Sequence, residues 1–190
     1  MYMTKIKLDA HLTAYPMPVC IVGTKVKEKP NFMAVAWFSK VNNEPPMMMV
    51  SLAKVQYTAE AIKENGVFSI NFPGKGLVAE TDFCGLVSGR NLDKSHVFTV
   101  HYGELVNAPM IGECPICFEL KVRETFELVD AFLFVGEVVA AYADEGYVKE
   151  GKVDISRTEQ FSLIESPSYQ YNGVGPKFAD AFEVGKKFLK

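Results

Sequence analysis

The stretch from residue 84 to 96, CGLVSGRNLDKSH, places two cations where an anion could be bound. Arg90 and Lys94 stand four positions apart, after a Ser88-Gly89 turn, and a helical path would put both on one side at a cost of about a few tenths of a kcal/mol. Two explanations stay open: Asp93 and water neutralise the pair, or an anion lies between the cations. Two or three charge-assisted hydrogen bonds to one phosphate, at about 1.5–3 kcal/mol each, would outweigh the repulsion.

A second candidate for anion binding is the start of a helix at Thr58. The segment YTAEAIKENG has Thr58 as its expected N-cap and Gly66 as its expected stop. The first N–H groups of a helix, together with its dipole, suit a phosphate. An ordinary helix cap explains Thr58 equally well when it is taken alone.

The pair Cys114-Pro-Ile-Cys117 has the spacing of redox or zinc chemistry. Zinc would need two further ligands, and the sequence offers no second cysteine pair and only three scattered histidines. A thioredoxin-like dithiol normally opens a helix, whereas this pair leads into a strand. The pattern favours structural cysteines, and the sequence predicts neither a metal site nor a catalytic side chain.

Trp37 is the only tryptophan and lies in a predicted strand just before Ser39. It serves either as a core residue or as a flat surface on which a cofactor stacks.

Composition limits the partners. The chain has 190 residues, 48% hydrophobic, with a net charge of −3, which fits one compact unit and argues against nucleic acid or an anionic membrane as partner. No apolar run reaches the roughly 18 residues of a membrane span, and the first residues lack a signal-peptide core. We therefore expect a cytoplasmic protein whose four cysteines are reduced.

The elements that must position these residues are mostly short strands. Residues 19–26 and 31–39 flank a Lys-Glu-Lys-Pro turn and are expected to form a hairpin. Further strands are expected at 47–52, 67–72, 116–124 and 132–142, and helices at 57–66 and 75–85. This pattern predicts a β-rich α+β fold, an antiparallel barrel with short inserted helices.

The strand at 116–124 alternates in hydrophobicity. Ile116, Phe118, Leu120 and Val122 are expected to point inward, and Cys117, Glu119, Lys121 and Arg123 outward. Near the end of the chain, Phe178 and Phe182 have the spacing of a packing helix. Without repeats or a linker, we expect a single domain over residues 1–190, with a core at about 14–175 and a C-terminal tail at 176–190.

Taken together, these segments resemble the flavin reductase-like, FMN-binding split-barrel family, and its flavoredoxin branch most of all. The resemblance rests on NFMAVAWFSKVNNEPPMMMVSLAKVQYTAEAIKENGVFSINFP, followed in order by CGLVSGRNLDKSH, APMIGECPICFELKV, FVGEVVAAY and SPSYQYNGVG. It implies an antiparallel split β-barrel homodimer that holds FMN in a groove at the subunit interface.

The resemblance also assigns cofactor-binding positions. It implies a flavin-ring wall at Ala36, Trp37, Phe38 and Ser39, a ring and ribityl border at Ser51, Leu52 and Ala53, phosphate contacts at Thr58, Ser88, Gly89, Arg90 and Lys94, and an aromatic contact at Tyr169. Asp93 is then expected to orient Arg90 or Lys94. Gln56-Tyr57 departs from the family, because many relatives carry a basic or small polar residue just before the helix threonine.

Three functions follow as hypotheses. The leading one is an FMN-dependent oxidoreductase that passes electrons from NAD(P)H or a reduced protein through FMN to an acceptor that the sequence does not identify. The first alternative is a flavin-binding electron carrier of the flavoredoxin type without NAD(P)H turnover. The second is a barrel without flavin in which the CPIC pair performs dithiol or metal chemistry.

Overall fold

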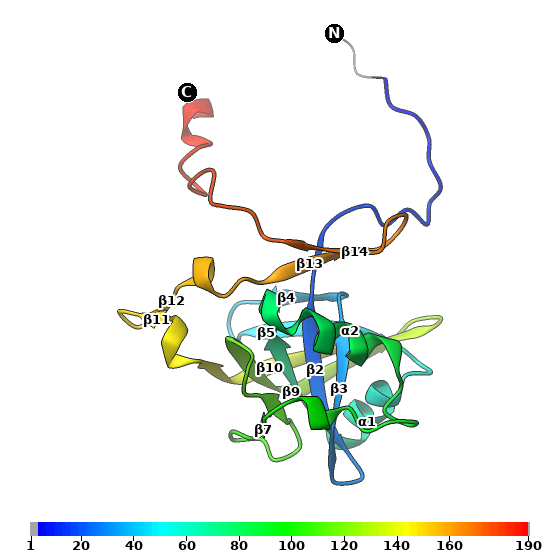
Figure 1. Ribbon diagram of the computed structural model, residues 1–190. Coiled ribbons are helices and arrows are strands. Elements are labelled where there is room, and N and C mark those ends of the chain that lie inside the picture. The colour runs from blue at the N-terminus through cyan, green and yellow to red at the C-terminus, as the bar shows by residue number, and fades with distance from the viewer. Residues whose placement is uncertain (1–3, 190) are drawn as a thin grey trace.

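A seven-stranded antiparallel sheet forms the body of the protein in a computed structural model that describes residues 4–189 (Figure 1). Its order is β3-β2-β6-β9-β10-β5-β4. The strands are β2 (Cys20–Val26), β3 (Lys29–Val35), β4 (Phe38–Asn42), β5 (Met47–Ala53), β6 (Val67–Phe72), β9 (Ile116–Glu127) and β10 (Ala131–Ala143). Val35, near one edge of the sheet, and Val50, near the other, belong to the same buried cluster, so the sheet curves around one core.

The predicted strand at 31–39 is in fact two strands, and Trp37 lies between them. β3 pairs with β2 at one edge of the sheet, whereas β4 pairs with β5 at the other. Ala36 and Trp37 are therefore the two residues that connect one edge strand of the sheet to the other. The Trp37 carbonyl accepts a hydrogen bond from Ser51 N–H (2.8 Å), and the Trp37 residue stays 52% exposed.

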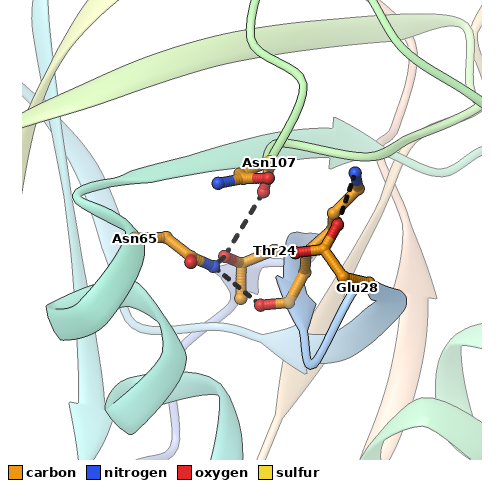
Figure 2. Close-up of polar contacts among 5 residues, drawn as sticks. Thr24, Glu28, Asn65 and Asn107 are labelled. Atoms are coloured by element: carbon orange, nitrogen blue, oxygen red, sulfur yellow. Dashed lines mark hydrogen bonds and ion pairs between the residues drawn. The ribbon is translucent and has the colours of Figure 1, made fainter.

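Helix α1 (Tyr57–Asn65) is fixed at its C-terminal end by backbone and side-chain bonds. Gly66 adopts a left-handed conformation (φ 66°) and its N–H donates to Ile62 O, as the sequence predicts. Asn65 Nδ2 donates to Thr24 Oγ1 (3.0 Å) and Lys25 O (2.7 Å), which ties the helix to β2 (Figure 2). Helix α1 begins differently from the prediction: Gln56 is the N-cap, and Thr58 is the second helical residue.

The predicted helix at 75–85 is confirmed as η1 (Lys75–Leu77) continuing into α2 (Val78–Leu86). α2 covers β3 on the face opposite the main core (Figure 1). A second buried cluster lies between them, and it includes Phe32, Cys84, Cys114 and Cys117.

The outward half of the pattern predicted for β9 is wrong at two positions. Cys117 and Glu119 are buried, because the segment holding β7 (Val100–His101) and β8 (Met110–Ile111) folds over that face. The Glu119 carboxylate accepts hydrogen bonds from Glu104 N–H, Leu105 N–H and the Tyr142 hydroxyl, at 2.9, 2.9 and 3.0 Å. A charged side chain is thus buried because three donors surround it.

Glu119→Gln is expected to lower the free energy of unfolding by about 2–4 kcal/mol. The amide keeps one acceptor oxygen and turns an NH2 donor toward groups that are themselves donors. Urea denaturation measures the change, with Glu124→Gln, an exposed position on the same strand, as the control. Equal stability of the two variants would contradict this role for Glu119.

A small sheet of β1 (Met17–Pro18), β13 (Phe161–Ile164) and β14 (Gln170–Gly173) lies beside the body, and the chain ends extend away from it (Figure 1). The remaining elements are β11 (Val148–Lys149), β12 (Lys152–Val153), η2 (Ser95–Val97), η3 (Glu145–Tyr147), η4 (Ile155–Arg157) and η5 (Lys186–Phe188). The expected packing helix in the tail does not form: Phe178 is 100% exposed and Phe182 is 94% exposed. Among the described residues, no helix is long and apolar enough to cross a membrane.

Candidate functional site

Two adjoining cavities lie between β3, the start of α1 and the end of α2. The polar cavity, of about 260 Å³, includes Thr58, Ser88, Gly89 and Lys94 in its lining. The apolar cavity, of about 300 Å³, includes Ala36, Trp37, Ser51, Ala53 and Tyr171. Both are bounded by Met33, Ala34, Gln56 and Gly85, so they form one groove with two chemically different ends.

The polar cavity contains the N-terminus of α1. The first bond at this end of the helix is donated by Ala59 N–H to Gln56 O (3.0 Å), so the N–H groups of Tyr57 and Thr58 precede it. Thr58 Oγ1 accepts a hydrogen bond from Asn31 Nδ2 (2.9 Å), and both side chains are buried. The Thr58 hydroxyl hydrogen is left to donate, and the helix end favours a negative charge.

The Ser88-Gly89 turn lies directly against Asn31. A Cβ atom at Gly89 would overlap Asn31 Oδ1 and would touch the Tyr57 ring. Ser88 Oγ accepts from Arg90 N–H (3.2 Å), which leaves the hydroxyl hydrogen as a donor. The absence of a side chain at residue 89 therefore lets the turn approach the start of α1 closely.

Lys94 is a buried cation, 4% exposed, at the end of α2. Its Nζ donates to Cys84 O (3.0 Å) and Val87 O (2.9 Å), and its third hydrogen has no protein acceptor in residues 4–189. No carboxylate within the described chain lies within 4.0 Å of this ammonium; the C-terminal end of α2 offers it only about half a negative charge. Burial lowers the pKa of Lys94, and the nearby Cys84 partly offsets this.

Residues 88–94 form a turn and not a helix, and Arg90 and Lys94 make different contacts there. Arg90 points to Glu60, with which it forms an ion pair, and lies over the Tyr57 ring, 4.6 Å from its centroid. The expectation that Asp93 orients one of these cations is also wrong. Asp93 Oδ1 accepts from Ser95 N–H (2.9 Å) and the Ser95 hydroxyl (2.7 Å).

The apolar cavity is bordered by aromatic and small side chains. Trp37 stands at its rim, and Ala36 and Ala53 leave room for a flat group. The Tyr171 hydroxyl donates to Asp82 Oδ1 (2.9 Å); burial, together with this carboxylate, raises the pKa of Tyr171 to about 12. The tyrosine is thus a neutral hydrogen-bond donor over the whole physiological range.

Residues 12–158 match the model of the flavin reductase like domain. The chain belongs to the flavin reductase-like family. Its sheet with few short helices corresponds to the split-barrel fold of relatives in this family.

Two solved flavoredoxins resemble the chain along almost its whole length. The flavoredoxin of Methanosarcina acetivorans is 47% identical, with a TM-score of 0.94 over 97% of this chain and 99% of that one. The flavoredoxin of Desulfovibrio vulgaris (Miyazaki F) is 36% identical, with a TM-score of 0.89 over 96% and 100%. An uncharacterised protein of Aeropyrum pernix is 30% identical over 149 residues, which are 76% of this chain and 57% of that protein.

Eight of the thirteen positions assigned from the family resemblance border the groove. The lining contains Ala36, Trp37, Ser51, Ala53, Thr58, Ser88, Gly89 and Lys94. The other five lie outside it: the Phe38 ring packs on Phe72, Ser39 is exposed, Leu52 is in the core, Arg90 faces Glu60, and Tyr169 is 75% exposed.

The groove also contains residues that sequence reasoning missed. Tyr171, in β14, borders the apolar cavity where Tyr169 was expected; Tyr169 precedes the strand and adopts a left-handed conformation (φ 46°). Gln56 borders both cavities, and its Oε1 is buried without a hydrogen-bond partner in the described residues. The signal for Gln56 was its departure from the family pattern.

The cysteines in this flavin reductase-like chain are buried and free. Burial raises the pKa of Cys84 to about 11 and that of Cys117 to about 12, and raises those of Cys20 and Cys114 as well. Neutral thiols are poor nucleophiles and poor metal ligands. The described residues contain no group of three side chains placed to hold a metal ion, so the CPIC alternative gains no support.

Proposed function

We propose that this protein binds FMN and transfers electrons through it, from NAD(P)H or a reduced protein to an acceptor. The observation that carries the proposal is the division of one groove into an apolar end beside Trp37 and a cationic end at Lys94. FMN has the same division, since a flat aromatic ring is joined by a hydroxylated chain to a phosphate. Bound flavin supplies hydride acceptance and one-electron transfer.

The residues present fit this cofactor from end to end. At the phosphate end, the N–H groups of Tyr57 and Thr58, the Ser88 hydroxyl and the Lys94 ammonium offer donors to an anion. In the middle, the unpartnered Gln56 Oε1 offers an acceptor to a ribityl hydroxyl or a ring N–H. At the ring end, Trp37, Ala36 and Ala53 offer an apolar wall.

The chain itself has little to do beyond binding and orientation. Glu165 and Tyr171 are the ionisable side chains that border the apolar cavity, and the tyrosine stays protonated. Hydride can reach a flavin without a side-chain acid or base. The protein's part is to hold the ring against its apolar wall and to neutralise the phosphate.

A second copy of the chain is proposed to cover the groove, giving a homodimer. Three apolar residues that border the cavities remain strongly exposed: Trp37 at 52%, Val55 at 84% and Leu86 at 74%. Large exposed apolar patches are typical of interaction surfaces. We also propose that residues 1–190 form a single domain with a C-terminal tail at 176–190. Sedimentation equilibrium should give twice the 21.1 kDa chain mass; a monomer at micromolar concentration would contradict it.

Electron carriage without NAD(P)H turnover is the second candidate, and the 47% identity to a flavoredoxin favours it. Purified protein is titrated with FMN, and the flavin absorption bands are followed. Steady-state oxidation of NADH and NADPH is then measured. A flavin spectrum with turnover supports the oxidoreductase, and a flavin spectrum without turnover by either donor supports the carrier. Failure to bind FMN would contradict both candidates.

A further inference from the structure

An outer pocket of about 290 Å³ adjoins the polar cavity on the side away from the apolar end. The polar cavity and the outer pocket are both bordered by Tyr57, Gly89 and Lys94. The outer pocket adds Lys27 from the β2–β3 turn, Lys29 from the start of β3, and Arg90. These three cations are not needed for the groove described above.

The charge of the outer pocket is positive and only partly compensated. Within the described chain, no carboxylate lies within 4.0 Å of Lys27 or Lys29. Glu28, between them, turns instead to Lys25, with 3.7 Å between Lys25 Nζ and Glu28 Oε2 (Figure 2).

Two acidic groups face the same region. Glu60 pairs with Arg90, and Asp93 is hydrogen-bonded to Ser95 while Lys29 contributes to lowering its pKa. These two carboxylates do not balance Lys27, Lys29, Arg90 and the buried Lys94, which all border the pocket.

The β2–β3 turn holds Lys27 at a conformational cost. Lys27 (φ 47°) and Glu28 (φ 66°) both adopt the left-handed conformation that a two-residue hairpin turn requires. Asn-Gly is the usual choice for this turn, because longer side chains are strained there. Lys27 therefore occupies a turn position that Asn or Gly would occupy with less backbone strain.

We propose that the outer pocket binds a second phosphate group, belonging to a nucleotide, beside the phosphate of the flavin. The proposal rests on the proposed FMN site. The guanidinium fork of Arg90 and the ammonium groups of Lys27 and Lys29 suit a phosphate, which accepts several charge-assisted hydrogen bonds at once. The phosphate comes either from a linked adenylate, as in FAD, or from a separate nucleotide bound next to FMN.

Lys27→Gln/Lys29→Gln tests the proposal without touching the groove. Dissociation constants are measured for FMN, for FAD, and for ADP in the presence of saturating FMN, at about 0.15 M salt so that distant charges are screened. The FMN constant is expected to change by less than about twofold, whereas the constant for FAD or ADP rises by about tenfold or more. Lys149→Gln/Lys152→Gln makes the same charge change in the β11–β12 hairpin and serves as the control.

Each outcome is decisive. A loss confined to FAD assigns a linked phosphate, and a loss confined to ADP assigns a separate nucleotide. If neither constant changes more than in the control, or if FMN weakens equally, the outer pocket is not a phosphate site. Failure of the wild-type protein to bind FMN would overturn the proposed function instead; lysine-dependent ADP binding without flavin would then still support the pocket.

Discussion

Lys94→Met is expected to raise the dissociation constant for FMN about a hundredfold, which is about 2.7 kcal/mol. The Lys94 ammonium is buried, borders the polar cavity, and keeps one hydrogen without a protein acceptor in residues 4–189. A phosphate there would gain a charge-assisted hydrogen bond in a region that water screens poorly. Methionine keeps the length of the side chain and fills the same space without the charge. Flavin fluorescence quenching measures the affinity.

The control for this prediction must separate binding from stability. Cys84 O and Val87 O lose their donor in the variant, so we expect a loss of about 1–2 kcal/mol in the free energy of unfolding. That cost is reduced because no ammonium need be buried any longer. Lys121→Met, at an exposed position in β9, should alter neither quantity. Unchanged FMN affinity in Lys94→Met would show that Lys94 only caps α2.

The pH dependence of binding gives the same test without relying on folding of a variant. Burial lowers the pKa of Lys94 below the ordinary lysine value of about 10.4. Without ligand, the buried Lys94 charge lowers the free energy of unfolding fully at neutral pH. This cost disappears as the pH rises through the lowered pKa and Lys94 loses its proton. FMN favours the charged form, so wild-type affinity should fall over the same pH range. Lys94→Met should lack that fall.

The sequence predicts the local elements of the site better than their partners. The helix at 57–66 follows from its composition and from Gly66, and the structure confirms it. The cap at Thr58 does not follow, because Asn31, from a distant strand, takes the Thr58 hydroxyl as its acceptor. The Thr58 hydroxyl can cap a helix or accept a bond from another side chain, and its spatial neighbours decide which. Asn31 lies 27 residues away in the chain, so the local sequence pattern does not predict this contact.

The burial of charged side chains is the other property that the local sequence pattern does not predict. Glu119 is predicted to point outward, yet it is buried, because backbone N–H groups of residues 104 and 105 donate to it; the burial of Lys94, which donates to Cys84 O and Val87 O, is likewise not predicted. Trp37 is the opposite case: an apolar run suggests a continuous strand, but the chain passes there from one edge of the sheet to the other. Contacts between segments decide Glu119 and Trp37, and the fold of the turn after α2 decides Lys94.

Gly89→Ala is expected to weaken FMN binding by about ten- to a hundredfold and to cost about 1–3 kcal/mol of stability. The added methyl group would overlap Asn31 Oδ1, and Asn31 is itself buried and bonded to Thr58. Either Asn31 moves and releases the Thr58 hydroxyl, or the turn lifts and carries Ser88 away from α1. Both responses separate donors that now border the same cavity.

The matched control is Gly76→Ala, since a Cβ at Gly76 meets no atom within 4 Å. Isothermal titration of FMN against both variants, with urea denaturation beside it, separates lost affinity from lost stability. Asn31→Gly in the Gly89→Ala background removes the overlapping side chain, so it should restore stability in part while FMN binding stays weak without the Asn31 bond to Thr58. Normal FMN affinity in Gly89→Ala would contradict the close approach of turn and helix as the basis of phosphate binding.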